Sequence, residues 1–138
     1  MFKLSKRGDY GLVFLLSLAL KNNKKPTSLS VISREKKLPP KFLAQLALAL
    51  KNAGIIDSKE GVGGGYFLSK SPKEITLLEI LEALEGSLST TVCQIRPGEC
   101  PVESICPSKS SWSDVTDRIL ASLKEKTLAD FLERRRNE

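Results

Sequence analysis

The sequence contains no histidine, and this absence removes several classes of site. Without an imidazole, the chain cannot form a Ser–His or Cys–His catalytic pair, and it lacks the commonest nitrogen ligand for metal ions. Carboxylates paired for acid–base catalysis are not evident either. The sequence therefore predicts that the protein is not an enzyme.

Long apolar segments are also missing. The longest run, residues 10–20, is interrupted by Gly11 and Ser17. It is too short to span a bilayer, and it lacks the small-residue cleavage site of a signal peptide. The 138 residues, 41% hydrophobic and 28% charged, have the composition of an ordinary globular protein. We therefore expect a cytoplasmic protein with no membrane partner.

Cysteine is scarce and confined to one stretch. The three cysteines all lie in residues 92–109, here called the cysteine loop, with six residues between the first two and five between the last two. Pro97-Gly98 is a turn signal, and a proline follows both Cys100 and Cys106, which disfavours regular structure. In a reducing compartment such thiols indicate metal binding or redox activity before structural disulfides. Thiolates suit iron–sulfur clusters, zinc or copper(I), but three of them leave a fourth ligand to come from elsewhere.

Charge is distributed unevenly along the chain. Residues 1–76 contain fourteen lysines and arginines against five acids, a net charge of +9, whereas the remainder has eight against eleven, a net charge of −3. A basic first half joined to an acidic second half indicates a polyanion-binding module with an appendage. We place the boundary between residues 1–75 and residues 76–138.

The first half shows the order of elements of a winged helix. Apolar spacing predicts helices over residues 6–21, from Ser28 or Ser30 onward, and over residues 40–52. The last two are joined by a tight turn, as in a helix-turn-helix. Strands at 55–58 and 66–68, joined by a glycine-rich turn, then predict a β-hairpin wing. The glycine run lacks the ending of a phosphate-binding loop and joins two strands, so we do not expect nucleotide binding.

The second half predicts an oligomerising appendage. A helix capped by Thr76 runs to about residue 85, and Thr127 caps a short last helix. Between them, residues 110–124 form a long helix whose apolar side has little to cover within so small a domain. That side contains Trp112, Val115, Ile119, Leu120 and Leu123. This pattern favours packing against a second copy. The expected fold class is mainly α with a small β-hairpin wing and a long C-terminal dimerisation helix.

Four motifs together resemble the IscR/NsrR/RirA-type family of winged-helix iron–sulfur transcriptional regulators, almost from end to end. They are residues 4–10 (LSKRGDY), residues 42–46 (FLAQL), residues 61–66 (GVGGGY) and the three spaced cysteines. The resemblance implies a homodimer with crossed long helices, two winged heads that bind double-stranded DNA, and a cluster at the dimer interface. Its function would be that of a repressor that senses iron, nitric oxide or redox state.

The resemblance also implies a ligand set. Cys93, Cys100 and Cys106 would bind the cluster. IscR-like members place a histidine three residues after the last cysteine, where this sequence has Lys109, a poor ligand. NsrR-like members use a first-helix carboxylate from the partner subunit, and Asp9 occupies that position. The resulting site favours a 4Fe–4S cluster, with 2Fe–2S as the alternative.

The DNA-binding residues follow from the same resemblance and from helix-turn-helix geometry. The recognition helix would enter the major groove, where Gln45 is able to form a bidentate contact to adenine. The complete candidate set is Ser5, Lys6, Arg7, Pro40, Lys41, Phe42, Gln45, Lys51 and Lys59. Two departures bear on it: Glu60 stands where relatives often have a wing arginine, and Ala44 where IscR-like proteins have glutamate. Two heads on a two-fold axis predict a palindromic operator.

Two alternatives remain for the cysteine loop. In the first, the same fold acts as a thiol/disulfide switch without a cluster. Arg96 would lower the pKa of the Cys93 thiol, and Cys100 and Cys106 would be the pair that forms the disulfide. In the second, the cysteines hold a structural zinc ion, which has no redox response.

Overall fold

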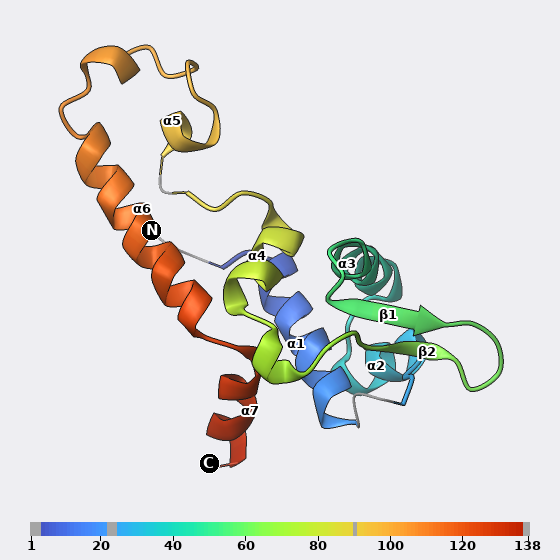
Figure 1. The fold of residues 1–138 in the computed structure, drawn as a ribbon. Helices are drawn as coiled ribbons and strands as arrows, with labels where there is room; N and C mark the ends of the chain where they lie inside the picture. The colour runs from blue at the N-terminus through green and yellow to red at the C-terminus, as the bar shows by residue number, and fades with distance from the viewer. Residues whose placement is uncertain (1–3, 22–24, 90, 137–138) are drawn as a thin grey trace.

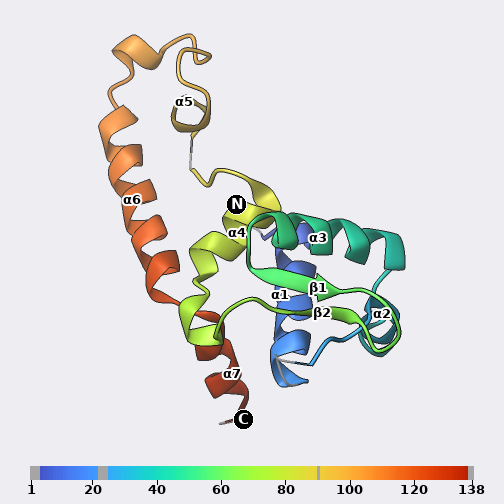
Figure 2. The same cartoon turned by 45° about the vertical axis from the view of Figure 1, so that its right-hand side comes forward.

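The computed structural model describes residues 4–21, 25–89 and 91–136. A head is formed by three helices and a hairpin: α1 (Lys6–Leu20), α2 (Leu29–Lys36), α3 (Pro40–Asn52), β1 (Ile56–Lys59) and β2 (Gly65–Leu68). The second half contains η1 (Pro72–Glu74), α4 (Leu77–Glu85), α5 (Val92–Ile95), η2 (Glu103–Ile105), α6 (Lys109–Glu125) and α7 (Leu128–Arg136). Long α6 stands beside the head, with the cysteine loop at its far end (Figures 1 and 2). The predicted fold class, mainly α with a β-hairpin wing, is confirmed.

The helices begin where their capping residues stand. The side chain of Ser5 accepts from the N–H of Gly8, and Ser28 does the same for Val31. Thr76 and Glu79 form a reciprocal capping box at the start of α4. Each cap satisfies N–H groups that have no partner within the helix, which fixes the first turn. These caps are local in sequence, and the predicted helix starts are confirmed.

The wing is a two-stranded antiparallel sheet in which Ile56 is opposite Leu68 and Lys59 opposite Gly65. Gly61 and Gly63 have φ values of 93° and 77°, which suit glycine in the connecting turn. An isolated bridge between Thr27 and Tyr66 ties the wing to the segment that enters α2. The hairpin is therefore held against the helix-turn-helix.

One hydrophobic core joins the head to both ends of the second half. Phe14 of α1 and Leu46 of α3 are fully buried, and so are Ile80 of α4 and Leu128 of α7. The N–H of Leu128 donates to the carbonyl of Ile75 at 2.9 Å, while the N–H of Leu77 donates to the carbonyl of Lys126 at 2.8 Å. The lower end of α6 is thus anchored to the start of α4.

The upper part of α6 has an apolar face that the described part of the chain covers only in part. Trp112, Val115 and Ile119 are 42%, 39% and 37% exposed, although α6 packs on α4 through a neighbouring face. This is the stripe that the sequence predicts to pack against a second copy, and that packing stays a prediction. In the described part of the chain, no helix combines the length and apolarity needed to cross a bilayer.

Gly11 sets how closely α1 approaches α4. A Cβ at this position would lie 2.3 Å from Cδ1 of Leu84, which is 3% exposed. We expect Gly11→Ala to destabilise the protein by about 1–3 kcal/mol through overpacking, measured by urea denaturation. Gly8→Ala is the matched control, because the nearest atoms there are the ends of the flexible Glu85 and Leu4 side chains. Equal stability of the two variants would contradict this account.

Candidate nucleic-acid interface and cysteine loop

The outward face of α3 carries the side chains of a recognition helix. Leu43 and Leu46 are buried, whereas Lys41 and Gln45 are exposed, as helical spacing requires. Pro40 occupies the first helical position, where a missing N–H has no cost. The structure therefore leaves Lys41 and Gln45 open to a ligand that runs along this face.

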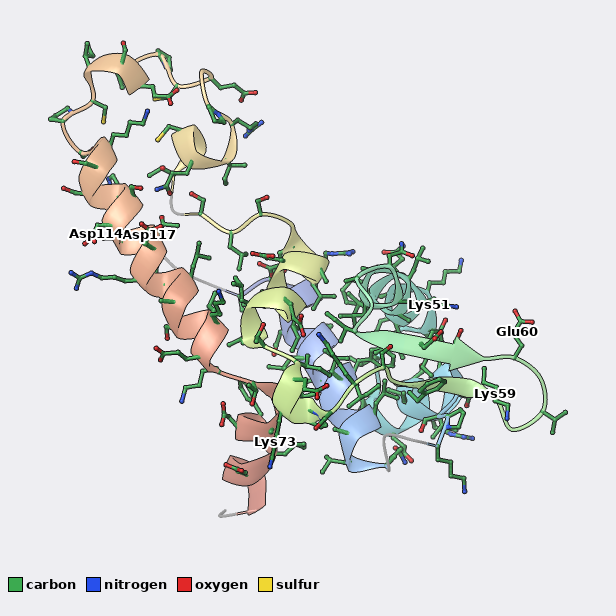
Figure 3. The ribbon with its side chains drawn as sticks, viewed as in Figure 1. Lys51, Lys59, Glu60, Lys73, Asp114 and Asp117 are labelled. Atoms are coloured by element: carbon green, nitrogen blue, oxygen red, sulfur yellow. The ribbon has the colours of Figure 1, made fainter. Side chains whose placement is uncertain are left out.

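Other predicted DNA contacts lie on α3 and the wing. The Nζ of Lys51 donates to Oγ of Ser58 at 2.6 Å, which joins the end of α3 to β1. Lys59 ends β1 and is exposed, with Glu60 next to it at the start of the turn; Figure 3 shows these side chains on the hairpin side of the head. Phe42 is half-buried and meets Tyr10 edge to face at 5.9 Å.

The first turn of α1 is bound to the last turn of α4. Nε of Arg7 donates to the carbonyl of Leu84 at 2.8 Å, and the N–H of Ser5 donates to Oε1 of Glu85 at 3.2 Å. The hydroxyl of Ser5 also bonds to Glu85. Ser5 and Arg7 thus have structural contacts in addition to their predicted role at DNA, while Lys6 is exposed. The sequence did not indicate either partner, Glu85 for Ser5 or the Leu84 carbonyl for Arg7.

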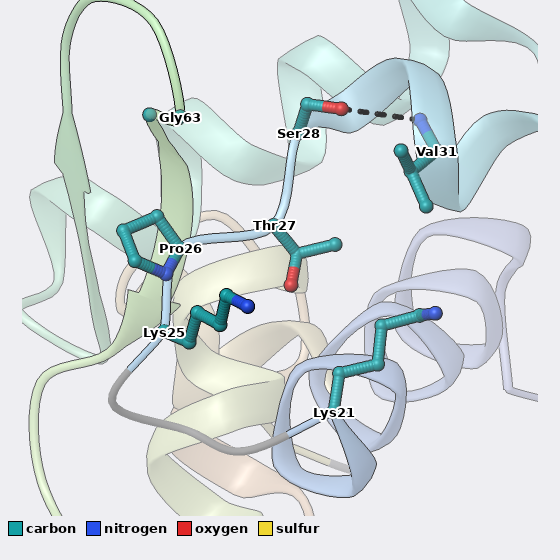
Figure 4. Close-up of a pocket in the computed structure, with 8 residues that line it drawn as sticks. Lys21, Lys25, Pro26, Thr27, Ser28, Val31 and Gly63 are labelled. Carbon is teal, nitrogen blue, oxygen red and sulfur yellow. Dashed lines mark hydrogen bonds between the residues drawn. The ribbon is translucent and has the colours of Figure 1, made fainter.

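Two hollows lie on the head. The first, of about 570 Å³, is formed where the segment before α2 approaches the wing, and Lys21 and Lys25 border it (Figure 4). Lys21 also pairs with Glu35 at 2.8 Å. The second, of about 670 Å³, lies between α1 and the α2–α3 turn; we call it the basic hollow. It is lined by Ser5, Lys6, Arg7, Tyr10, Lys37, Leu38, Pro39 and Phe42. Positively charged side chains line both hollows, so both favour anionic ligands.

The cysteine loop is more structured than its proline content predicts. Cys93 lies within the single turn of α5, which ends at Ile95 before Pro97, and η2 precedes Cys106. All three thiols are free and half-buried. Sγ of Cys93 lies 3.2 Å from Oγ1 of Thr91, and Sγ of Cys106 lies 3.2 Å from Oγ of Ser108. Hydroxyl neighbours of this kind stabilise a thiolate.

The start of α6 acts on Cys106. The hydroxyl of Ser108, followed by the N–H groups of Ser108 and Lys109, holds the pKa of the Cys106 thiol below its ordinary value. A helix N-terminus beside a sulfur favours the thiolate, which is the form that binds metals and attacks disulfides. Cys106 is therefore set up as a ligand or as a reactive thiol.

Glu103 closes the loop on itself. It accepts from the N–H of Gly98 at 2.6 Å and from Nζ of Lys109 at 3.0 Å. The Gly98 N–H and then Lys109 lower the pKa of Glu103, and Glu103 in turn raises the pKa of Lys109, with smaller contributions from Cys93 and Cys106. Lys109 thus serves as a cation beside two thiols. From the sequence, Lys109 was noted only as a poor ligand at the position where IscR-like members have a histidine.

Gln94 fastens the loop to α6. Its Oε1 accepts from Oγ1 of Thr116 at 2.7 Å and also from the hydroxyl of Ser89. Thr116 is 6% exposed, although it lies on a helix that is otherwise mostly accessible. The residue next to Cys93 is therefore held on the middle of α6. Sequence reasoning missed this contact because its partners are 22 residues apart.

The donor set of the loop fits an iron–sulfur cluster in its chemistry. Three free thiols lie within fourteen residues, and two of them, Cys93 and Cys106, have a hydroxyl neighbour and the Lys109 cation nearby, which suits thiolate ligands. Within the described residues of this single chain, however, no three cysteine or acidic side chains form a group that could hold a metal ion. Asp9 is exposed in the first turn of α1, and its predicted role as a ligand stays a prediction.

Comparisons with known proteins agree with this geometry. The family model of Rrf2, described as an iron-dependent transcriptional regulator, matches residues 4–134. The regulator IscR of Photorhabdus laumondii is 32% identical over 130 residues, which cover 94% of this chain and 79% of that protein. Two solved structures also match, each with a TM-score of 0.75. CymR, the global cysteine regulator of B. subtilis, is 34% identical, with 95% and 96% of the two chains covered. IscR of T. potens is 32% identical, with 96% and 87% covered.

Proposed function

Because this chain belongs to the Rrf2 family of transcriptional regulators, we propose that it is a homodimeric repressor whose affinity for DNA is gated by an iron–sulfur cluster. Its relatives are named as regulators, and the expectation that the protein is not an enzyme is confirmed. The proposal places the protein in the cytoplasm, where thiols remain reduced.

DNA would bind across α3, the wing and the first turn of α1. Lys41 and Gln45 are exposed together on one face of α3, so they would enter the major groove. Lys51 and Lys59, with Lys6, would meet phosphates, and such contacts carry most of the affinity. The two heads of a dimer would read a palindrome with half-sites one helical turn, about 34 Å, or a multiple of it apart.

The observation that carries the gating proposal is a continuous set of contacts from the cysteine loop to the head. Gln94 is bonded to Thr116 on α6, and the lower end of α6 is joined to the start of α4 through Thr127 and Thr76. The other end of α4 accepts from Arg7 in the first turn of α1. A change in the loop is therefore mechanically connected to the basic face by helices that pack on one another.

Cys93, Cys100 and Cys106 would hold the cluster, with Asp9 of the partner subunit as the fourth ligand. When bound, a cluster of this kind supplies sensitivity to iron supply, oxygen or nitric oxide, and an oxygen ligand leaves one corner open to exchange. Neighbouring residues of the chain hold these ligands in place. The Ser108 hydroxyl favours the thiolate of Cys106, Thr91 lies beside the sulfur of Cys93, Lys109 places a positive charge beside both, and Gln94 joins α5 to α6.

Metal removal tests the proposal directly. Protein purified without oxygen should contain iron and sulfide, and chelation should change its affinity for operator-length DNA by roughly 5–150-fold, the range typical of coupled binding sites. Affinity would be measured by fluorescence anisotropy at fixed salt. Zinc in place of iron would indicate a structural site. Iron-free protein whose DNA affinity does not respond to metal would end the gating idea.

A thiol switch without a cluster is the second candidate, and the environment of Cys106 favours it. The Ser108 hydroxyl and then the N-terminus of α6 lower the pKa of this thiol, so Cys106 would be the thiolate that a peroxide oxidises to a sulfenic acid, from which the Cys100 thiol displaces water to form the disulfide. Metal analysis and mass spectrometry of protein purified without oxygen, before and after mild oxidation, distinguish the candidates, because the switch is iron-free beforehand and gains one disulfide, whereas the cluster form carries iron and sulfide before it is oxidised.

A further inference from the structure

Lys37 adopts a backbone conformation that lysine rarely takes. It ends α2 with φ 56° and ψ 40°, and among the described residues it is the one non-glycine with positive φ. The left-handed region places Cβ too close to the carbonyl oxygen, and glycine or asparagine normally occupies it. Helix termination alone therefore does not explain a lysine here.

The surroundings impose this conformation. The N–H of Leu38 donates to the carbonyl of Ser33 at 3.1 Å, and the hydroxyl of Ser33 donates back to the carbonyl of Leu38 at 2.6 Å. Leu38 is 8% exposed and belongs to the core. The two hydrogen bonds between Ser33 and Leu38, with the burial of Leu38, thus fix the backbone of Lys37 while its side chain remains exposed.

The side chain of Lys37 lines the basic hollow together with Lys6 and Arg7. Of the eight lining residues these three are cations and none is acidic. Within the described residues, neither Lys6 nor Lys37 forms an ion pair. Three like charges around one hollow repel one another, and an anion between them would remove that repulsion.

The walls of the hollow point to an extended anion. Pro39 provides no side-chain cap for α3, so the first turn of the recognition helix is open toward the hollow. The edge-to-face pair of Tyr10 and Phe42 forms a firm apolar wall at 5.9 Å between ring centroids. A phosphodiester seated here would lie at the first turn of the helix that carries Lys41 and Gln45.

We infer that the basic hollow is the seat of a DNA backbone phosphate and that Lys37 is the residue that binds it beside the recognition helix. The inference rests on the proposed function and adds a contact and a position to it. Lys37 fixes the depth and angle at which α3 enters the groove, because phosphate contacts set register whereas base contacts specify sequence.

Replacing Lys37 by glycine removes the charge while keeping a residue that suits the backbone conformation. Lys37→Gly relieves the backbone strain, so its melting temperature should rise, whereas its affinity for DNA should fall by roughly 10-fold. The slope of log affinity against log salt should drop by about 0.9 per chain that touches DNA, or about 1.8 for a dimer. The probe is a fluorescently labelled duplex of mixed sequence, since phosphate contacts do not depend on the operator. A purely structural lysine would change the melting temperature alone.

Two variants serve as controls. Lys37→Arg keeps the charge and should retain the salt slope of the unmodified protein. Lys73→Gln removes an exposed lysine from η1, outside the hollow, and should leave the slope unchanged. If the unmodified protein binds DNA and Lys37→Gly matches it in affinity and slope, the inference fails while the proposed function stands.

A free phosphate ion is the competing occupant. Inorganic phosphate, compared with chloride at equal ionic strength, should not displace the duplex, because a DNA backbone offers many contacts besides this one. Displacement by phosphate that is abolished in Lys37→Gly would assign the hollow to a small anion and overturn the DNA assignment. Absence of any DNA binding by the unmodified protein at low salt would overturn both the proposed function and this inference.

Discussion

In the Cys100→Ala variant we expect iron and sulfide to fall to background and the DNA affinity to equal that of chelated protein. A cluster requires all three thiolates, because a protein site that offers only two of them leaves two corners to exchangeable ligands. Cys93→Ala and Cys106→Ala should therefore give the same result as Cys100→Ala. The expected change in affinity corresponds to a coupling free energy of about 1–3 kcal/mol.

Equivalence of the three cysteines is the discriminating feature of this series. A disulfide requires two thiols, so a thiol switch predicts that Cys93→Ala keeps its response to oxidant whereas the other two variants lose it. Ser104→Ala is the matched control within the loop, since Ser104 is exposed and forms none of the described contacts to the thiols.

Asp9→Ala should retain the thiolates but lose the cluster more rapidly, as a weaker ligand set would. Unchanged cluster lifetime in Asp9→Ala would remove the partner's carboxylate from the ligand set.

Local signals explain why most of the fold was predictable. Ser5, Ser28 and Thr76 each precede an apolar-periodic segment, and each caps the helix that follows it. The wing was equally accessible, because two short strands around a glycine run have few alternative arrangements. The capping contacts join residues three positions apart, and the strand pairs of the wing lie within twelve positions of one another.

Contacts between distant residues were not predictable. Nothing in the spacing of Leu128 indicates that it enters the same core as Phe14, and the pairing of Gln94 with Thr116 spans 22 residues. Arg7 illustrates the consequence for the site. Its charge and position predict a phosphate contact, and the structure adds a bond from its Nε to the carbonyl of Leu84 that the sequence did not indicate. Side chains of long reach are placed by tertiary neighbours that the sequence does not reveal.

The conformation of Lys37 was not predictable from the sequence for a different reason. Its αL conformation normally announces itself through glycine or asparagine, and the sequence has neither at this point. The sequence therefore indicated the turn between α2 and α3 only through Pro39 and Pro40. The ligand arrangement of the cysteine loop also lies beyond one chain, because its fourth member is expected from a partner.

A carboxylate placed on the exposed face of α6 should separate the dimer. Ile119 is 37% exposed and lies between Val115 and Leu123 on the apolar stripe of the helix. In a dimer built on this stripe, Ile119→Glu would bury an unpaired charge, which costs more than any contact it replaces. We expect the variant to elute as a monomer in size-exclusion chromatography with light scattering. Its affinity for a palindromic duplex should fall by roughly 100-fold or more, since the second head no longer binds as part of one molecule.

Ala121→Glu is the matched control because it adds the same charge to the same helix on the opposite side. Ala121 is exposed, and helical geometry places it about 180° from Trp112. This variant should remain dimeric and bind DNA as the unmodified protein does. If Ile119→Glu also remains dimeric, the copies associate through another surface. A dimer formed through another surface would not be expected to bring the partner's α1, with its Asp9, to the cysteine loop, because Gln94 and Thr116 hold the loop on α6.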